Sequence, residues 1–188
     1  MRILCFGDSN TFGYDPRSYF GDRYPAQHRW VDLVAEKSGW ELVNIGQNGR
    51  EIPHRTYELP RICRELADCA PADIFVVLLG YNDLLQGASV PEILRRMEQF
   101  LTQVPTECGD ILLVAPPPMK LGLWVPEEHL LSSSAQLAED YQTLAQKLGI
   151  GFADAGEWNV ELTFDGVHFS QAGHAAFAEG IYSVLQYM

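Results

Sequence analysis

Five short runs of apolar residues recur along the chain, and they constrain its fold more than any other feature. The strongest run, DIFVVLLG at residues 73–80, carries no charged or polar side chain after its first position. A continuous run of this kind is typical of a strand that is covered on both faces, because a strand with one wet face alternates. The runs occupy residues 2–7, 41–46, 73–80, 110–118 and 150–156. They predict the strands of a mostly parallel sheet with helices on both sides.

Helical patterns fill the intervals between these runs. Gly39 and Gly149 follow two of the patterns, and Pro60 and Pro91 stand near the start of two others. Helices commonly end at glycine and tolerate proline in their first turn. The expected helices cover residues 30–39, 60–68, 90–103 and 133–148, with a last helix that Ser170 caps. The alternation predicts a three-layer α/β/α fold with a five-stranded sheet, and 188 residues suit a single domain over residues 1–188.

Two segments interrupt this alternation. Residues 13–29 are rich in aromatic and polar side chains, and residues 116–132 are rich in proline. Both follow an expected strand, so both should lie at the carboxyl end of the sheet. That end is where α/β folds bind their ligands, and these two loops are therefore expected to border a site.

The charge balance and the cysteines narrow the class of protein. A net charge of -12 disfavours binding to nucleic acids and to anionic lipid surfaces. No apolar run approaches the roughly 20 residues of a membrane helix, and MRILCF is too short for the apolar core of a signal peptide. The four cysteines form no CxxC pair, which predicts reduced thiols in a cytoplasmic protein and no structural zinc site. They are Cys5, Cys63, Cys69 and Cys108.

Ser9 directly follows the first expected strand, in the stretch GDSN. A serine at a strand end is often only a turn or capping residue. The stretch lacks the Lys-Ser/Thr ending of a phosphate-binding loop and the GxGxxG pattern of a dinucleotide site. It also lacks the GxSxG pattern of the α/β-hydrolases. The remaining functional interpretation is a nucleophile, which needs a base and an orienting acid nearby.

The stretch TFDGVHFS supplies both groups. Asp165 and His168 stand three residues apart, between the fifth strand and the last helix, so they also belong at the carboxyl edge. A carboxylate placed there can accept a proton from one imidazole nitrogen and leave the other for Ser9. The alternative histidines are His28, His54, His129 and His174. His174 falls on the last expected helix and is expected at the surface.

Two further strand ends offer hydrogen-bond donors. Asn82 in GYND follows the strongest strand, although Asn and Asp also favour plain turns. Gly49 and Gly46 lie in NIGQNGR after the second strand, where glycine either permits a positive φ or exposes a backbone N–H. Donors of this kind stabilise the negative charge that develops on a carbonyl oxygen during acyl transfer.

Taken in order, these stretches resemble the four sequence blocks of the SGNH, or GDSL-type, serine hydrolases. The matching stretches are GDSN at 7–10, Gly49 in NIGQNGR, GYND at 80–83 and DGVH at 165–168. RW at 29–30, PPP at 116–118 and DAG at 154–156 are similar to the arylesterase/acyltransferase branch of that family. The resemblance implies the SGNH hydrolase variant of a flavodoxin-like fold.

The resemblance also implies a role for each matching residue. Ser9 would attack an ester carbonyl, His168 would act as general base, and Asp165 would orient His168. The backbone N–H groups of Ser9 and Gly49 and the side chain of Asn82 would bind the oxyanion. No metal or organic cofactor is implied.

Three residues next to these motif residues are not expected to take part in the chemistry. Asn10 stands where the name motif of the family has leucine, a departure expected to matter little. Asp8 and Asp83 are expected to fix their loops through hydrogen bonds to backbone N–H groups.

The substrate is expected to be a small ester. Tyr14, Tyr81, Trp124 and Phe164 are candidate pocket residues, while Trp30 on a helical apolar face is expected in the core. The short chain has no evident lid, which favours short acyl groups, such as acetyl, on a carbohydrate, aryl or small alcohol. Transfer of the acyl group to another alcohol is a further expectation.

Three alternatives stay open at this point. The same site would suit a thioesterase, and the same fold would suit a binding module without catalysis. A metal-dependent hydrolase would instead use Asp8, Asp165 and His168 as ligands. Association into a homo-oligomer is compatible with so small a subunit, but no sequence feature gives a number of copies.

Overall fold

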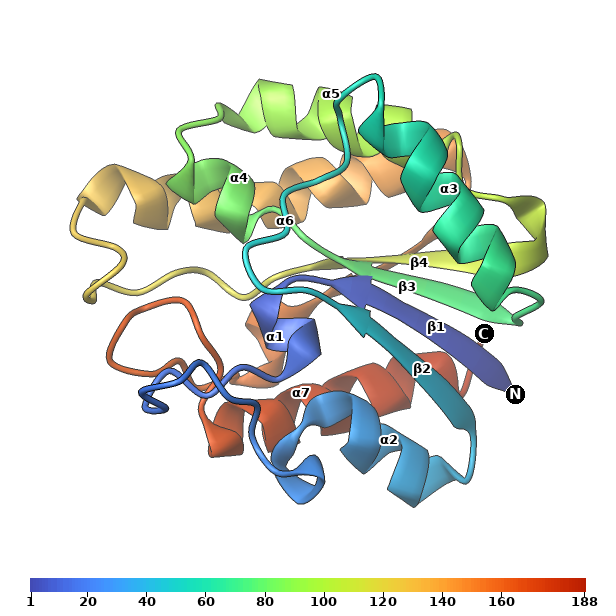
Figure 1. Ribbon diagram of the computed structural model, residues 1–188. Helices are drawn as coiled ribbons and strands as arrows, with labels where there is room; N and C mark the ends of the chain where they lie inside the picture. Colours follow the sequence, from blue (N-terminus) through green and yellow to red (C-terminus); the bar gives the residue numbers. More distant parts are fainter.

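A five-stranded parallel sheet forms the centre of the structure, which is a computed structural model that describes residues 1–188 (Figure 1). The strands lie in the order β2-β1-β3-β4-β5 and all neighbours pair in parallel. Their bounds are β1 Arg2–Gly7, β2 Glu41–Gly46, β3 Ile74–Leu78, β4 Asp110–Ala115 and β5 Gly151–Asp154. The predicted three-layer α/β fold is confirmed, and the sheet is parallel throughout.

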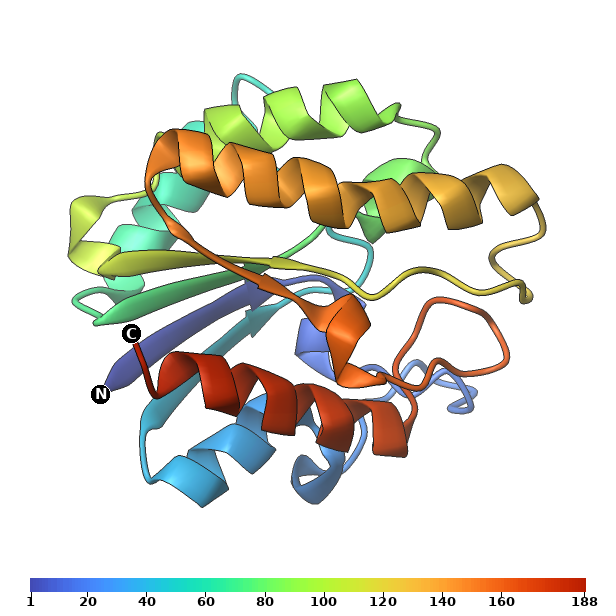
Figure 2. The ribbon, with the colours of Figure 1, turned by 180° about the vertical axis from the view of Figure 1, so that it is seen from behind.

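Helices cover both faces of this sheet (Figures 1 and 2). One face carries α3 (Glu58–Cys69), α4 (Tyr81–Leu85), α5 (Val90–Leu101) and α6 (Glu128–Leu148). The other face carries α2 (Trp30–Ser38) and α7 (Gln171–Leu185). The short α1 (Ser9–Phe12) follows β1 directly. Single 3₁₀ turns lie at Ala26–His28, Thr106–Cys108 and Ala155–Trp158.

The central strands divide their side chains between two apolar cores. On β1, Leu4 and Phe6 pack with the α3–α6 side, whereas Ile3 and Cys5 pack with the α2–α7 side. All four are essentially inaccessible to solvent. Because side chains alternate across a strand, burial on both faces requires the continuous apolar runs seen in the sequence.

The strands β3, β4 and β5 end earlier than the apolar runs that predicted them, whereas β1 and β2 have the predicted bounds. The run 73–80 continues past Leu78, but Gly80 has a φ of 128°, which takes the chain out of extended geometry. The run 110–118 ends in three prolines, which have no N–H to donate to a ladder. Both runs therefore leave the sheet at its carboxyl edge.

Several helices differ from their predicted bounds. The helix α6 begins at Glu128 rather than at 133, so the loop predicted over 116–132 is shorter. Its first two turns contain serines of moderate helix propensity, which hid the helical pattern. The short helices α1 and α4 were not predicted as helices, because each spans too few residues to show a period.

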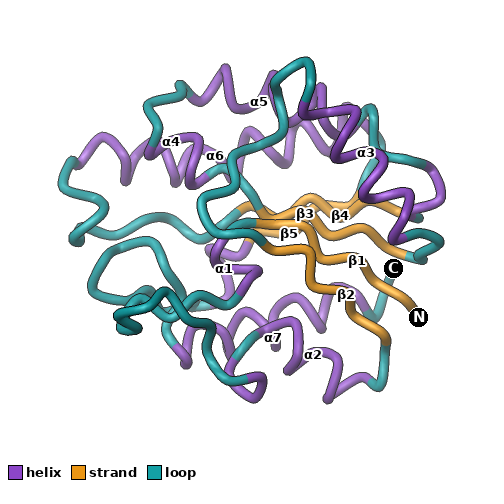
Figure 3. Tube along the Cα trace, viewed as in Figure 1, coloured by secondary structure: helices purple, strands orange, loops and turns teal.

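The loops that follow β1, β4 and β5 gather at the carboxyl end of the sheet (Figure 3). The helices of the chain are too short or too polar to cross a membrane. All four cysteines are free thiols, and Cys5 and Cys108 are buried.

Candidate active site

Ser9 sits where β1 turns sharply into α1. A Cβ at Gly7 would overlap the side chain of Thr11, so this close turn requires glycine. The Asp8 side chain caps α1 by accepting the backbone N–H of Asn10 at 2.9 Å. The turn leaves the Ser9 hydroxyl at the carboxyl edge of the sheet, with 6% of the residue exposed. Burial raises the pKa of Asp8 to about 6.

His168 and Asp165 lie beside this serine in a hydrogen-bonded chain. The Nε2 atom of His168 is 3.0 Å from the Ser9 Oγ, and its Nδ1 atom is 2.7 Å from the Asp165 Oδ2. Asp165 is fully buried, and its Oδ1 accepts the Thr163 hydroxyl together with the backbone N–H groups of Val167 and His168. Burial alone would raise the pKa of Asp165, but the hydrogen bonds from His168 and the backbone lower it to about 2. The carboxylate is therefore ionised and oriented toward the imidazole.

The other histidines lie away from this chain. The exposed His129 has its Nδ1 atom 3.1 Å from the Glu127 Oε2, and His54 borders a separate polar pocket. The expectation that His174 lies at the surface is wrong, because its side chain is completely buried against Tyr24 and Phe169. Residue 174 falls on the face of α7 that packs on the sheet, which helix periodicity alone did not reveal.

The two rival glycines differ in whether their N–H is free. The N–H of Gly46 donates to the side chain of Asn44 at 2.9 Å, and a Cβ at Gly46 would overlap the backbone of Phe12. Gly49 has a φ of 72°, and its N–H donates to no group of the chain. The Ser9 N–H, in the first turn of α1, also has no partner within the helix. The Asn82 amide donates to the Arg50 carbonyl at 3.0 Å and still has a second hydrogen.

One pocket, with a volume of about 240 Å³, is lined by Ser9, Gly49, Asn82 and His168. The remaining walls are Tyr14, Asn48, Leu85, Trp124 and Val167. The ring centroids of Tyr14 and Trp124 lie 4.8 Å and 6.4 Å from that of His168. The pocket is therefore mainly apolar, with polar groups gathered at the serine.

Two of the four predicted pocket residues lie elsewhere. Tyr81 is buried in the core, where its hydroxyl donates to the Pro117 carbonyl. It precedes Asn82 on a helical turn, so the two side chains point in different directions. Phe164 is 60% exposed and borders a different surface hollow, with Arg17 and Tyr24. Asn48, Leu85 and Val167 were missed, although each lies within three residues of a motif residue.

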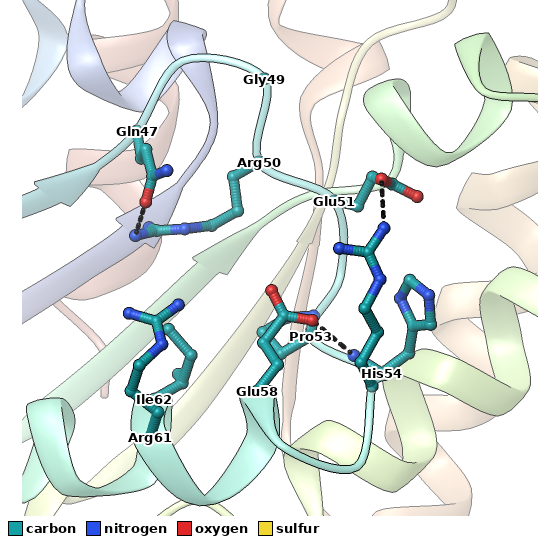
Figure 4. A pocket seen from close by; sticks show the side chains of 10 residues that line it. Gln47, Gly49, Arg50, Glu51, Pro53, His54, Glu58, Arg61 and Ile62 are labelled. Atoms are coloured by element: carbon teal, nitrogen blue, oxygen red, sulfur yellow. Dashed lines mark hydrogen bonds and ion pairs between the residues drawn. The ribbon is translucent and has the colours of Figure 1, made fainter.

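Arg50 fixes the loop that carries Gly49. Its guanidinium donates to the Gly7 carbonyl at 3.0 Å and to the Ile45 carbonyl. A third hydrogen bond goes to the Gln47 side chain at 3.1 Å (Figure 4). The guanidinium also lies over the Phe6 ring, 4.1 Å from the centroid. Burial lowers the pKa of Arg50 to about 10, so it stays charged near neutral pH. The arginine thus joins the ends of β1 and β2 beneath the loop.

A second, polar pocket of about 130 Å³ lies on the far side of this loop (Figure 4). Its charged walls are already paired. Arg61 contacts Glu65 at 2.5 Å, and Arg55 lies 4.0 Å from Glu51. Gly49 borders both pockets, so the loop from Gln47 to Arg50 separates them.

Glu51, His54 and Asp83 form a cluster whose potential ligand atoms lie within 4.8 Å of one another. Arg96 contacts both carboxylates, at 3.3 Å for Glu51 and 3.0 Å for Asp83, and thereby supplies the compensating positive charge. Burial raises the pKa of Asp83 to about 6 even though Arg96 and the Ile52 N–H lower it. The ligand set considered from sequence, Asp8 with Asp165 and His168, does not form such a cluster.

Comparison with known proteins identifies the family of the chain and shows which solved structures share its fold. Residues 5–176 match the model of the GDSL-like lipase/acylhydrolase family. An aryl esterase from M. smegmatis is 26% identical with a TM-score of 0.85, covering 99% of this chain and 98% of that one. A carbohydrate acetylesterase family member from Sinorhizobium meliloti is 27% identical with a TM-score of 0.86, covering 99% and 97%. A member of the lipolytic protein G-D-S-L family from Veillonella parvula, 19% identical over the full length of both chains, shares the fold with a TM-score of 0.79. A search of curated proteins found no match.

Proposed function

This chain belongs to the GDSL-like lipase/acylhydrolase family and is a carboxylic ester hydrolase, and from that premise we propose that Ser9, His168 and Asp165 form its catalytic triad. The observation that carries the proposal is the hydrogen-bonded chain from Asp165 through His168 to Ser9. It ends at a pocket where the N–H of Gly49 has no partner. A serine that only caps a turn is not expected to combine a hydrogen-bonded histidine and aspartate with an adjacent pocket.

In the proposed reaction, the Ser9 Oγ attacks the ester carbonyl carbon while His168 takes the hydroxyl proton on Nε2. Asp165 keeps the Nδ1–H of His168 directed toward itself and stabilises the imidazolium that forms. The imidazolium then protonates the departing alkoxide, which leaves as an alcohol. Water attacks the acyl-enzyme with His168 again as base, releasing the carboxylic acid and the free serine.

The negative charge of the tetrahedral intermediate needs donors aimed at the former carbonyl oxygen. We assign this role to the N–H groups of Ser9 and Gly49 and to the free amide hydrogen of Asn82. All three residues line the same pocket. A well-placed donor of this kind contributes on the order of 3 kcal/mol of transition-state stabilisation.

The pocket favours a short acyl group. Its volume of about 240 Å³ is small, and Tyr14, Leu85 and Trp124 give it apolar walls. The named relatives, an aryl esterase and a carbohydrate acetylesterase family member, support acetyl-type esters of aryl or carbohydrate alcohols as the substrate class. The same apolar walls would help a second alcohol to compete with water, giving acyl transfer.

The test is hydrolysis of p-nitrophenyl acetate by the wild type and Ser9→Ala, each with and without EDTA. We expect Ser9→Ala to lose about 10⁴-fold or more in kcat, since the nucleophile of a triad is indispensable. EDTA should leave the wild-type rate unchanged. Ser183→Ala is the matched control, because Ser183 is remote from the pocket and donates only to the Gly180 carbonyl of its own helix. A Ser9→Ala rate equal to that of wild type would exclude the triad.

A chain-length series resolves the substrate class. Among p-nitrophenyl esters we expect the acetyl ester to have the highest kcat/KM and esters beyond about four carbons to fall steeply. An acetylated sugar and an acyl-CoA at matched concentration distinguish an ester hydrolase from a thioesterase. Faster turnover of the acyl-CoA than of the acetyl esters would contradict the proposed substrate class.

A further inference from the structure

The side chain of Asn10 bridges the short helix of the nucleophile and the loop of the base. Its Nδ2 donates to the carbonyl of Val167 at 3.2 Å, and its Oδ1 accepts the N–H of Phe169 at 2.8 Å. These two peptide groups stand immediately before and after His168. One amide side chain therefore holds the backbone on both sides of the imidazole-bearing residue.

This bridge has no substitute within the chain. The Val167 carbonyl and the Phe169 N–H form no other hydrogen bond, and Asn10 is 3% exposed. Removing the amide would leave two buried peptide groups without partners, and the loop would relax to satisfy them. Asp165 holds the same loop only from its own side, through the N–H groups of Val167 and His168.

Asn10 is itself held in place. Its N–H donates to Asp8, and its carbonyl accepts the indole N–H of Trp30 at 3.1 Å. Trp30 is buried in the α2–α7 core. The amide is therefore fixed on α1, the same short helix that carries Ser9. The proposed nucleophile lies on this helix, and the loop of the proposed base is hydrogen-bonded to it through Asn10.

We propose that Asn10 is a positioning residue that acts through His168, setting the distance from its Nε2 to the Ser9 Oγ. The inference rests on the proposed function of Ser9 and His168. A displacement of about 1 Å in a reacting group can cost about 10²-fold in rate, so a bridge that holds His168 has kinetic consequences. With this role, the departure from leucine at position 10 would matter, contrary to the expectation from the sequence.

The principal variant is Asn10→Leu, which keeps the number of side-chain heavy atoms in a bulkier group and removes both hydrogen bonds. Asn10→Ala removes them with a smaller side chain, in case leucine disturbs folding. Thr11→Val is the matched control, because Thr11 lies next in the same helix, is equally buried, and its hydroxyl has no hydrogen-bond partner. With p-nitrophenyl acetate we expect both Asn10 variants to lose 10- to 100-fold in kcat with KM within twofold. Thr11→Val should stay within twofold of wild type in both constants.

A double-mutant cycle with His168→Ala shows whether the effect passes through the base. If Asn10 acts by positioning His168, Asn10→Leu changes the residual rate of His168→Ala by less than twofold. Labelling of Ser9 by a fluorophosphonate should slow in Asn10→Leu by the same factor as kcat, since both reactions need the base.

Three results would overturn the inference. The first is an Asn10→Leu substitution that lowers the rate by the same factor in the wild type and in His168→Ala. The second is a kcat of Asn10→Leu no lower than that of Thr11→Val. The third is failure of both Asn10 variants to fold, which would assign Asn10 to folding rather than to positioning. Failure of the proposed function shows differently, as full activity in Ser9→Ala and His168→Ala.

Discussion

The buried carboxylate of Asp83 accepts the backbone N–H of Ile52 through its Oδ2 atom, at 3.0 Å. This bond connects α4, which carries Asn82, to the loop after β2, which carries Gly49. Two of the three donors that we assign to the oxyanion, those of Gly49 and Asn82, are therefore held together by a residue that does not line their pocket. Arg96 on α5 balances the charge of Asp83 at 3.0 Å.

Asp83→Ala should destabilise the protein strongly. The substitution leaves the Ile52 N–H buried without an acceptor, which costs about 1–3 kcal/mol. Arg96 loses one carboxylate partner and keeps Glu51 and Glu92. The free energy of unfolding in urea measures the loss. Arg61→Ala is the control, because its ion pair with Glu65 is exposed and should contribute less than about 1 kcal/mol. Equal losses in the two variants would contradict this role for Asp83.

Asn82→Ala should lower kcat by about 10²- to 10³-fold on p-nitrophenyl acetate, because it removes one of the donors that we assign to the developing oxyanion. Gln86→Ala, one turn later and exposed, is the control and should not change kcat. Measuring kcat and KM separately tells transition-state stabilisation from substrate binding, since lost uniform binding would raise KM alone.

Gly46→Ala should disturb folding far more than Gly49→Ala. A Cβ at Gly46 meets the backbone of Phe12, which cannot move aside without disrupting α1, so little folded protein is expected. A Cβ at Gly49 meets nothing within 4 Å, and only its φ of 72° opposes alanine, at about 1–2 kcal/mol. Circular dichroism and urea unfolding of the two variants test this contrast. A well-folded Gly46→Ala protein would show that the turn after β2 is more adaptable than this packing allows.

His174 makes stability depend on pH. Its burial, with smaller contributions from the nearby charges of Arg29, His168 and His28, lowers its pKa from 6.5 to about 3. Between these values the unfolded chain binds a proton that the folded chain does not, so stability falls as the pH falls. Between pH 7 and pH 5, this group alone lowers the free energy of unfolding by about 2 kcal/mol.

Comparison with His174→Phe isolates this contribution. In this variant the free energy of unfolding should fall by about 2 kcal/mol less between pH 7 and pH 5 than in the wild type, because phenylalanine does not titrate. This holds whatever the absolute stability of the variant. Asp8 and Asp83, with pKa values raised to about 6, act in the opposite direction in both proteins and cancel in the comparison. Urea unfolding at pH 5, 6 and 7 provides the free energies. Parallel pH profiles for the two proteins would show that His174 is protonated in the folded state.

The secondary structure could be read from the sequence largely because both faces of the central strands β1, β3 and β4 are buried. Burial on two sides makes the runs at 73–80 and 110–118 apolar without interruption, and the helices between them carry the usual end signals. The start of α6 could not be read, because only Leu130 is buried among residues 128–132 and three serines follow at 132–134. The short helices after β1 and β3 are fixed by the turn geometry at Gly7 and Gly80 rather than by periodicity.

For the site, the order of motifs along the chain was more informative than any single residue. Ser9, Asn82 and His168 each follow a strand, and parallel strands bring their carboxyl ends to one edge. The directions of individual side chains did not follow from that argument. Tyr81 turns into the core beside Asn82, and Phe164 turns outward, because each direction depends on the local helix or loop geometry. The bridge from Asn10 joins residues 157 and 159 positions away, a contact that no local pattern encodes.

The distance along the chain between Ser9 and His168 has a consequence for biosynthesis. The two residues are 159 positions apart, so at 5–20 residues per second the ribosome adds His168 roughly 8–30 s after Ser9. Throughout that interval the serine is an ordinary alcohol with no base beside it. On the proposed mechanism, Ser9 becomes reactive only when the loop after β5 docks on the first helix. A nascent or prematurely terminated chain would then lack esterase activity, and acquisition of reactivity by Ser9 would report that translation and folding have reached the far end of the sheet.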